Sequence, residues 1–451
     1  MARHHTRRGL DLPIPGAPSP QVERGRITRR VAVLGADYGG VRLHPLVQAG
    51  ARVQVGTPVL EARQRGGLLL TAPASGRVAA IHQGPRRRIE SVVIEVDGQD
   101  TLGFSRPSLS SSTDTGLRQL LQASGAWMAL RERPFGHPPL PDATPSAIFV
   151  TATDTQPLAP SSRVILEGRE EDLMRSLEAL SHFGEGPVFL CADPEVAKLL
   201  GGAKLPKRTQ LETFSGPHPS GSVGFHVHRL SPVSRTHVAW HIGLQDALMI
   251  GKLLDTGQLD HRRIASVAGP SALRPRLVET NMGAALGELL VGETREGPEV
   301  RVISGSVLSG RAAAGEIFGY LGRFHQQVSL VPEHRDREFL GWLTPGARRF
   351  SSARVFLSSF FRPKAFDFTT DTHGGHRAIV PIGQYERVMP MDILPTFLAR
   401  ALVSQDLERL EALGALELEE EDVALMTFVC PSKIEYGPLL RTALDRLEAE
   451  A

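Results

Sequence analysis

The chain has 451 residues, of which 41% are hydrophobic, and this length predicts about three domains with ordinary cores. Lys and Arg number 51 against 49 Asp and Glu, and a net charge of +2 argues against nucleic-acid binding. No apolar stretch reaches the roughly 18 residues of a spanning helix, and the N-terminus lacks the apolar core of a secretory signal, so we expect a cytoplasmic protein. The two cysteines, Cys191 and Cys430, form no Cys-x-x-Cys pair and support neither a disulfide framework nor an iron–sulfur cluster.

The first hundred residues alternate short apolar runs with Gly/Pro turns. Leu68–Thr71 and Arg77–Ile81 flank an Ala-Pro-Ala-Ser-Gly turn, and Val53–Leu60 and Ser91–Val96 follow the same pattern. Together these segments resemble the barrel-sandwich domain of biotinyl and lipoyl carriers, in which the loop between two central strands presents the modified lysine. The first lysine of this chain is Lys198, so we predict a packing and docking module and not a swinging-arm carrier.

The next region alternates apolar strands with helices, which indicates a parallel sheet covered by helices. Asp193 followed by Pro194 is typical of a helix N-terminus. Neither strand-to-helix junction carries Gly-x-Gly-x-x-Gly or a Walker loop, so we predict a Rossmann-like fold that binds no dinucleotide. The expected elements are helices at 116–133, interrupted at Gly125, and at 170–183, 194–200 and 245–254, and strands at 147–151, 187–191 and 238–242.

From Arg262 the pattern becomes strand, strand, helix, strand, which is compatible with a β-grasp unit. Ser304–Gly310 can be read as a phosphate cradle, but it lacks the lysine and the glycine spacing of one, so we favour a β-grasp turn. The expected strands are 264–270, 275–280, 300–305, 320–332 and 339–343 with a helix at 282–290, followed by C-terminal helices at 392–403, 405–413, 420–428 and 437–449.

The predicted fold class is therefore α+β multidomain. We expect an N-terminal barrel-sandwich domain over 1–110, a Rossmann-like α/β domain over 111–258, a β-grasp (SLBB-like) domain over 259–335, and a C-terminal segment, 336–451, that ends in a helical domain.

Histidine pairs are the only pattern that suggests a metal. His226 and His228 would share one face of a strand, and His373 and His376 flank two glycines. None of these pairs has a third ligand at motif spacing, and neither His-Glu-x-x-His nor Gly-x-Ser-x-Gly occurs. We therefore predict no metal site and no catalytic residue.

Several longer segments carry a family resemblance. The segments are Arg8–Ile14, Phe214–Gly221, Arg301–Leu308, Val380–Gly383, Tyr385–Pro390, Phe428–Pro431 and Glu435–Leu440. They resemble the NqrA family of the sodium-translocating NADH:quinone oxidoreductases, from about Arg8 to the C-terminus. The resemblance implies a peripheral subunit on the cytoplasmic face of the bacterial inner membrane. Its partners would be subunits B to F of a six-subunit complex that passes electrons from NADH to ubiquinone and exports Na⁺.

A more distant resemblance links the chain to the flavin- and NADH-binding subunits of respiratory complex I and of the Rnf complex. Where those relatives have a glycine-rich flavin loop, this chain has Gly35–Arg42, in which Asp37 would repel a flavin phosphate. Their cysteine cluster is also missing. We therefore expect NADH, the flavins and the iron–sulfur centres on the other subunits and no cofactor on this chain; a flavin- or NADH-binding role is a weaker alternative.

Two roles stay open for the chain within such a complex. It helps to bind or reduce ubiquinone, or it is an assembly subunit without a ligand site, and we expect no independent activity in either case. A quinone head group needs hydrogen-bond donors and flat apolar surface. The candidates are Tyr38, Arg42, Trp127, Arg131, Arg133 and Phe135. The alternative is that Trp127 and Phe135 are core residues and the arginines are surface residues.

Overall fold

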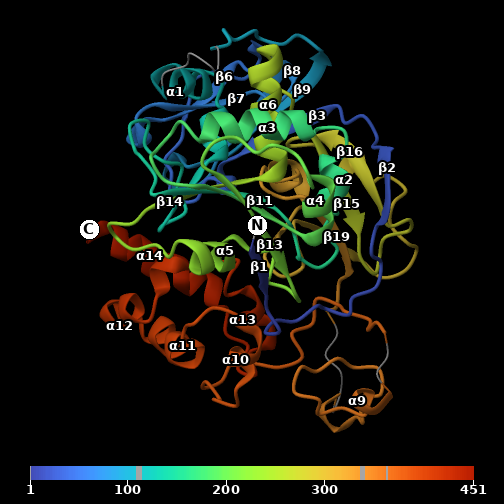
Figure 1. Cartoon of the computed structure of the whole chain (residues 1–451). Coiled ribbons are helices and arrows are strands. Elements are labelled where there is room, and N and C mark those ends of the chain that lie inside the picture. Colours follow the sequence, from blue (N-terminus) through green and yellow to red (C-terminus); the bar gives the residue numbers. More distant parts are fainter. Residues whose placement is uncertain (1, 108–113, 336–340, 362–363, 451) are drawn as a thin grey trace.

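The computed structural model describes residues 2–107, 114–335, 341–361 and 364–450. Within them the strands form two six-stranded sheets, one four-stranded sheet and one three-stranded sheet. Figure 1 shows the N-terminal sheets at the top, the parallel sheet in the middle, a second large sheet on the right and the C-terminal helices below. The predicted fold class is confirmed.

The two small sheets form the barrel-sandwich domain. One has the order β3-β9-β8-β5 and the other β4-β6-β7. Gly56 has the positive φ, 91°, that its turn requires. The strands are β3 Arg30–Leu34, β4 His44–Pro45, β5 Arg52–Val53, β6 Pro58–Ala62, β7 Leu68–Thr71, β8 Ser75–Gln83 and β9 Ile89–Gly98.

The turn between β7 and β8 is not presented to solvent. Ala72 is 0% exposed and Ala74 is 5% exposed, and the hydroxyl of Thr71 donates to the carbonyl of Ser124 at 3.0 Å. The turn thus packs against the neighbouring α/β domain, where a carrier domain would expose its lysine.

The first 24 residues pair outside the barrel-sandwich domain. β1, Ala2–His5, runs parallel to β13, and β2, Ser19–Arg24, runs parallel to β16. Each strand therefore joins one of the two large sheets and ties the N-terminus to it.

The central sheet has the order β1-β13-β12-β11-β14-β10, with β10 antiparallel to β14 at one edge. Its other strands are parallel, and α3 and α6 pack together beside it. Asp193 caps α4 by accepting from the backbone N–H groups of Glu195 and Val196, as predicted. The strands are β10 Arg131–Arg133, β11 Ala147–Ala152, β12 Val188–Ala192, β13 Thr209–Ser215 and β14 Ala239–Gly243; the helices are α1 Asp114–Ala123, α2 Ser162–Leu166, α3 Glu170–Leu180, α4 Pro194–Leu199, α5 Val223–Leu230 and α6 Leu244–Thr256.

The predicted interruption of the helix over 116–133 at Gly125 is confirmed, but the second half of that helix is wrong. Gly125 takes a left-handed conformation, φ 74°, after the end of α1. The chain then forms the short helix η4, Ala126–Ala129, and the edge strand β10.

The second large sheet has the order β18-β17-β19-β15-β16-β2 and forms the β-grasp domain. Ser304–Gly310 turns the chain from β17 into β18, as expected for a β-grasp hairpin. The helix predicted over 282–290 is reduced to α7, Leu286–Leu289; of the strand predicted at 339–343, residues 339 and 340 lie outside the described residues and Gly341–Leu343 form the short helix η5. The remaining elements are β15 Arg262–Ala268, β16 Arg276–Asn281, β17 Val300–Ser304, β18 Arg311–Ala312, α8 Gly315–Phe318 and β19 Gln327–Pro332.

The C-terminal helices pack on the α/β domain and share a core with it. Phe149 and Phe214 of the sheet belong to the same apolar cluster as Leu398 and Leu440. No helix in the described part of the chain is long and apolar enough to cross a membrane. The helices are α9 Ser358–Phe361, α10 Gln384–Val388, α11 Pro395–Ser404, α12 Leu407–Ala412, α13 Ala424–Val429 and α14 Tyr436–Ala449.

Candidate functional site

A cavity of about 400 Å³ lies at the carboxyl ends of β11 and β14. The chain runs from β11 to β12 and β13 on one side and then returns to β14 on the other, so the strand order reverses here. Ligands of open α/β sheets bind at such a reversal. The β-grasp domain, the segment Gly35–Gly39 and the C-terminal region at 419–421 close the cavity, so four parts of the chain build it.

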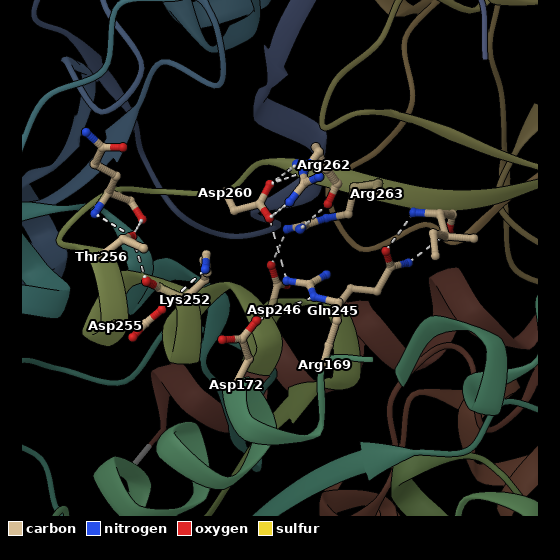
Figure 2. Close-up of polar contacts among 12 residues, drawn as sticks. Arg169, Asp172, Gln245, Asp246, Lys252, Asp255, Thr256, Asp260, Arg262 and Arg263 are labelled. Carbon is tan, nitrogen blue, oxygen red and sulfur yellow. Dashed lines mark hydrogen bonds and ion pairs between the residues drawn. The ribbon is translucent and has the colours of Figure 1, made fainter. Parts of the chain in front are cut away.

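One wall is formed where α6 meets β15. The amide of Gln245 makes two bonds to the backbone of Ile264: its Nε2 donates to the carbonyl at 2.9 Å, and its Oε1 accepts from the N–H at 2.8 Å. Figure 2 shows Asp246 pointing toward Arg263, and both side chains are buried. These contacts fix the β-grasp domain against the parallel sheet.

A second wall carries arginines whose charges are neutralised by carboxylates. Arg311 lies 2.7 Å from Asp37, and the backbone N–H of Arg323 donates to the same carboxylate at 2.9 Å. The guanidinium of Arg323 also lies 3.5 Å from Asp246. The carboxylate of Asp37 therefore already occupies the place where these basic groups would otherwise bind an anion such as a phosphate.

The third wall is acidic. Glu419 lies 3.4 Å from Arg133, 3.7 Å from His241 and 3.8 Å from Arg131, and only 5% of its side chain is exposed. Burial opposes the charged form of Glu419, but the attraction of Arg133 and the contact with His241 hold its pKa well below the usual range. Burial lowers the pKa of His241 to about 4, so this ring is neutral near pH 7.

Asp154 follows β11 and faces the cavity without a basic partner among the described residues. Its carboxylate accepts from the N–H of Gln156 at 2.8 Å and lies 3.5 Å from the amide of Gln326. Burial raises the pKa of Asp154 to about 6, against a usual value of 3.8. The cavity thus holds one carboxyl group that exchanges protons near neutral pH.

Of the six predicted quinone residues, only Arg131 lines the cavity. Its guanidinium carbon lies 4.3 Å from the ring centroid of Phe324, which also lines the cavity. Tyr38 does not line the cavity, but its ring packs edge-on against Phe324 with 6.0 Å between the ring centroids, and the residue is buried. Through Phe324 the structure brings Tyr38 and Arg131 together.

The other four candidates do not reach the cavity. Trp127 packs edge-on against Phe183 and Trp240, and its indole N–H donates to the carbonyl of Pro139 at 2.8 Å. Arg133 is held by buried carboxylates. Neither Arg42 nor Phe135 is among the residues that line the cavity.

Sequence reasoning missed Asp154, His241 and Phe324. The first two stand at or directly after the ends of predicted strands, and the strand-order rule for α/β sheets would have found them once the order was known. Phe324 has no local signal, because the β-grasp domain brings it to the cavity from outside the parallel sheet.

The histidine pairs give no metal centre. His226 and His228 lie on α5 and not on a strand, so the predicted shared strand face is wrong; residues two apart on a helix point in different directions. His226 is buried and contacts the carbonyl of Ser220 at 3.0 Å. Within the described ranges no group of three His, Cys, Asp or Glu side chains is arranged to hold a metal ion.

Three family models match the chain, and together they follow its order of domains. Residues 5–97 match the NqrA N-terminal barrel-sandwich hybrid domain, residues 112–259 match the NqrA second alpha/beta domain, and residues 264–315 match the NQRA C-terminal domain, an SLBB model.

Curated relatives are similar over the full length. The NqrA protein of Yersinia pseudotuberculosis, which belongs to the Na(+)-translocating NADH-quinone reductase, is 47% identical over 451 residues, with 98% of this chain and 99% of the relative covered. The Klebsiella pneumoniae protein of the same name is 49% identical and the Pasteurella multocida protein 47%, with equal coverage. The chain belongs to the NqrA family. It is thus a subunit of an oxidoreductase complex, as the sequence resemblance implied.

Two solved structures of an NAD⁺-reducing NiFe hydrogenase, air-oxidised and H₂-reduced, are each 15% identical to the chain, with TM-scores of 0.37 and 0.40. They cover 76% and 78% of this chain, which spans 65% and 67% of theirs.

Proposed function

We propose that this chain serves the quinone-reducing end of the NADH-quinone reductase and receives the quinone head group in the cavity between β11, β14 and the β-grasp domain. The observation that carries the proposal is the pair formed by Arg131 and Phe324, which presents a donor 4.3 Å from a flat aromatic ring on the cavity wall. NADH, the flavins, the iron–sulfur centres and the sodium path are assigned to partner subunits B to F. The chain itself would lie on the cytoplasmic face of the inner membrane.

The chemistry of the wall supports this assignment. A quinone ring stacks on aromatic surface, and its two carbonyl oxygens accept hydrogen bonds from groups such as the guanidinium of Arg131 or the neutral ring of His241. Reduction of a quinone to a quinol takes two electrons and two protons. The electrons come from the partner subunits, and Asp154, whose pKa is about 6, is suited to pass a proton.

The test is calorimetric titration of the full-length chain with a short-tailed, water-soluble ubiquinone. We expect saturable binding that weakens roughly 5- to 30-fold in Arg131→Met and in Phe324→Leu, because each change removes a contact of roughly 1–2 kcal/mol. Arg42→Met is the matched control, since Arg42 does not line the cavity, and it should bind as the parent does. The proposal fails if the parent chain shows no saturable binding, or if all variants bind equally.

The second candidate is an assembly subunit without a ligand. It is favoured by the pairing of cavity charges within the chain, as between Arg311 and Asp37 or Arg263 and Asp246. The two roles differ in cells that carry Arg131→Met. An assembled complex with slow quinone reduction supports the quinone role, whereas an assembled complex with the parent rate supports assembly alone.

A further inference from the structure

Between β19 and α10 the chain leaves the sheets and forms a lobe, which we define as residues 341–361 and 364–383. Its regular structure is limited to the single turns η5 and α9. Figure 1 shows α9 at the lower right, at the outer limit of this orange segment and away from both large sheets.

Five of the six phenylalanines of the lobe fall into two groups. Phe350, Phe366 and Phe368 face inward: Phe350 meets Phe366 at 5.4 Å and Phe368 at 5.5 Å between ring centroids, and it meets Phe428 of α13 at 5.9 Å. This inner group attaches the lobe to the C-terminal helices.

The outer group has no such role. Phe360 and Phe361 are 80% and 72% exposed on α9, and Val355 and Leu343 are 71% and 60% exposed. Large apolar side chains that project from a surface in a cluster mark an interaction site. Neither phenylalanine has a ring contact among the described residues, so removing them should leave the fold intact.

Basic residues flank this apolar tip along the sequence. The lobe contains five Lys and Arg residues against two Asp residues. Arg348, Arg354 and Lys364 are exposed, and no carboxylate in the described parts of the chain pairs with them. Of the two aspartates, Asp371 already contacts His334 and His373, and Asp367 is exposed, so basic groups remain in excess over the lobe.

We propose that the lobe is a membrane-contact element, which inserts Phe360 and Phe361 into the head-group region of an anionic bilayer. Aromatic rings favour that region, while basic side chains around them are drawn to negatively charged head groups. The tip lies at the outer limit of the chain, where a bilayer surface can reach it (Figure 1). The proposal concerns this chain's own contact with lipid and does not depend on quinone binding in the cavity.

The test is flotation of the full-length chain with two kinds of vesicle, pure phosphatidylcholine and phosphatidylcholine mixed with phosphatidylglycerol. We expect binding to the anionic vesicles alone. The double variant Phe360→Ser/Phe361→Ser should bind at least tenfold more weakly, because two apolar side chains no longer leave water. Phe397→Ser is the matched control: Phe397 is an exposed phenylalanine on α11, outside the lobe, and its loss should change nothing.

Charge is tested separately with Arg354→Gln/Lys364→Gln, for which we expect about a fivefold loss for each basic charge removed. The proposal is overturned if the parent floats with neither vesicle, floats equally with both, or floats unchanged after the phenylalanine substitutions. Binding confined to native membranes that contain the integral subunits would identify the tip as a protein interface and would overturn it as well.

Discussion

Nη1 of Arg133 lies 2.8 Å from Oδ2 of Asp422, and the two side chains are 1% and 0% exposed. The arginine ends the edge strand β10, and the aspartate precedes α13, so the pair joins the parallel sheet to the C-terminal helices. The carbonyl of Glu417 accepts a further bond from Arg133 at 2.9 Å. Burial raises the pKa of Asp422 despite this attraction, which means that the aspartate depends on the arginine for its charge.

Arg133→Met should therefore destabilise the chain by about 3–5 kcal/mol, because it leaves Asp422 and Glu419 as buried carboxylates without their main counter-charge. Urea unfolding followed by tryptophan fluorescence measures the loss. Adding Asp422→Asn should recover part of it. Arg63→Met is the control, since Arg63 pairs with Glu61 on the surface, and should cost about 1 kcal/mol or less; equal losses for the two arginines would contradict the prediction.

Asp154→Asn should stabilise the chain at alkaline pH. The folded carboxyl group holds its proton up to about pH 6, while the unfolded group releases it near 3.8, so the parent loses stability as pH rises between these values. Asparagine keeps the bond from Gln156 and has no charge to bury. We expect a gain of up to about 3 kcal/mol at pH 8 and none at pH 4, as measured by urea unfolding.

The control for this change is Asp142→Asn, at an exposed position. It should leave stability unchanged at both pH values. A gain for Asp154→Asn that is equally large at pH 4 and pH 8 would show that the effect does not come from the charge of the carboxylate.

How much of this fold the sequence predicts depends on how far apart along the chain the interacting residues lie. Local alternation was enough for the barrel-sandwich strands and for the helix cap at Asp193. It did not reveal β1, whose Ala2 pairs with Glu212, because nothing in the four residues Ala-Arg-His-His indicates a partner so far away. It located the break at Gly125 but did not reveal that the edge strand β10 follows, because β10 pairs with the distant strand β14.

The candidate site shows the same limit. Trp127, Arg131 and Arg133 are close in sequence, and together they suggested a quinone site. Tertiary packing separates them, since Trp127 turns into the core, Arg133 turns toward α13, and Arg131 alone faces the cavity. Residues from the β-grasp domain complete the wall, and their approach depends on how the domains dock.

His261→Leu should make the chain more resistant to acid. Burial lowers the pKa of His261 to about 3 from 6.5, and neither ring nitrogen has a hydrogen-bond partner among the described residues. The unfolded ring binds a proton below pH 6.5 and the folded ring does not, so the parent loses stability as pH falls. Leucine takes up no proton in either state. Relative to the parent, the variant should therefore gain about 2 kcal/mol in free energy of unfolding as the pH falls from 6.5 to 5.

Thermal unfolding at the two pH values measures this effect. His376→Leu, at an exposed position, is the control and should leave the pH dependence as it is in the parent. If both variants follow the parent's pH dependence, His261 makes no contribution to acid sensitivity.

The full-length chain should carry no flavin after gel filtration. Asp37 lies 2.7 Å from Arg311 and accepts from the backbone of Arg323, so the groups that would hold a flavin phosphate already have a carboxylate. Visible absorption of the purified chain tests this directly. A flavin band at one equivalent per chain would contradict it.

Finally, the barrel-sandwich domain should remain unmodified even when it is given a lysine. No lysine precedes Lys198 in the parent chain, so neither biotin nor lipoate can be attached to this domain. In Ala74→Lys the new side chain would replace a residue that is 5% exposed, on a turn held against Ser124 by Thr71. A ligase needs an exposed turn, so we expect the intact mass of the variant to show no adduct after expression with a biotin or lipoyl ligase, while an authentic carrier domain expressed alongside is fully modified. An adduct on the introduced lysine would mean that the turn leaves its packed position, and that the domain keeps the accessibility of a carrier.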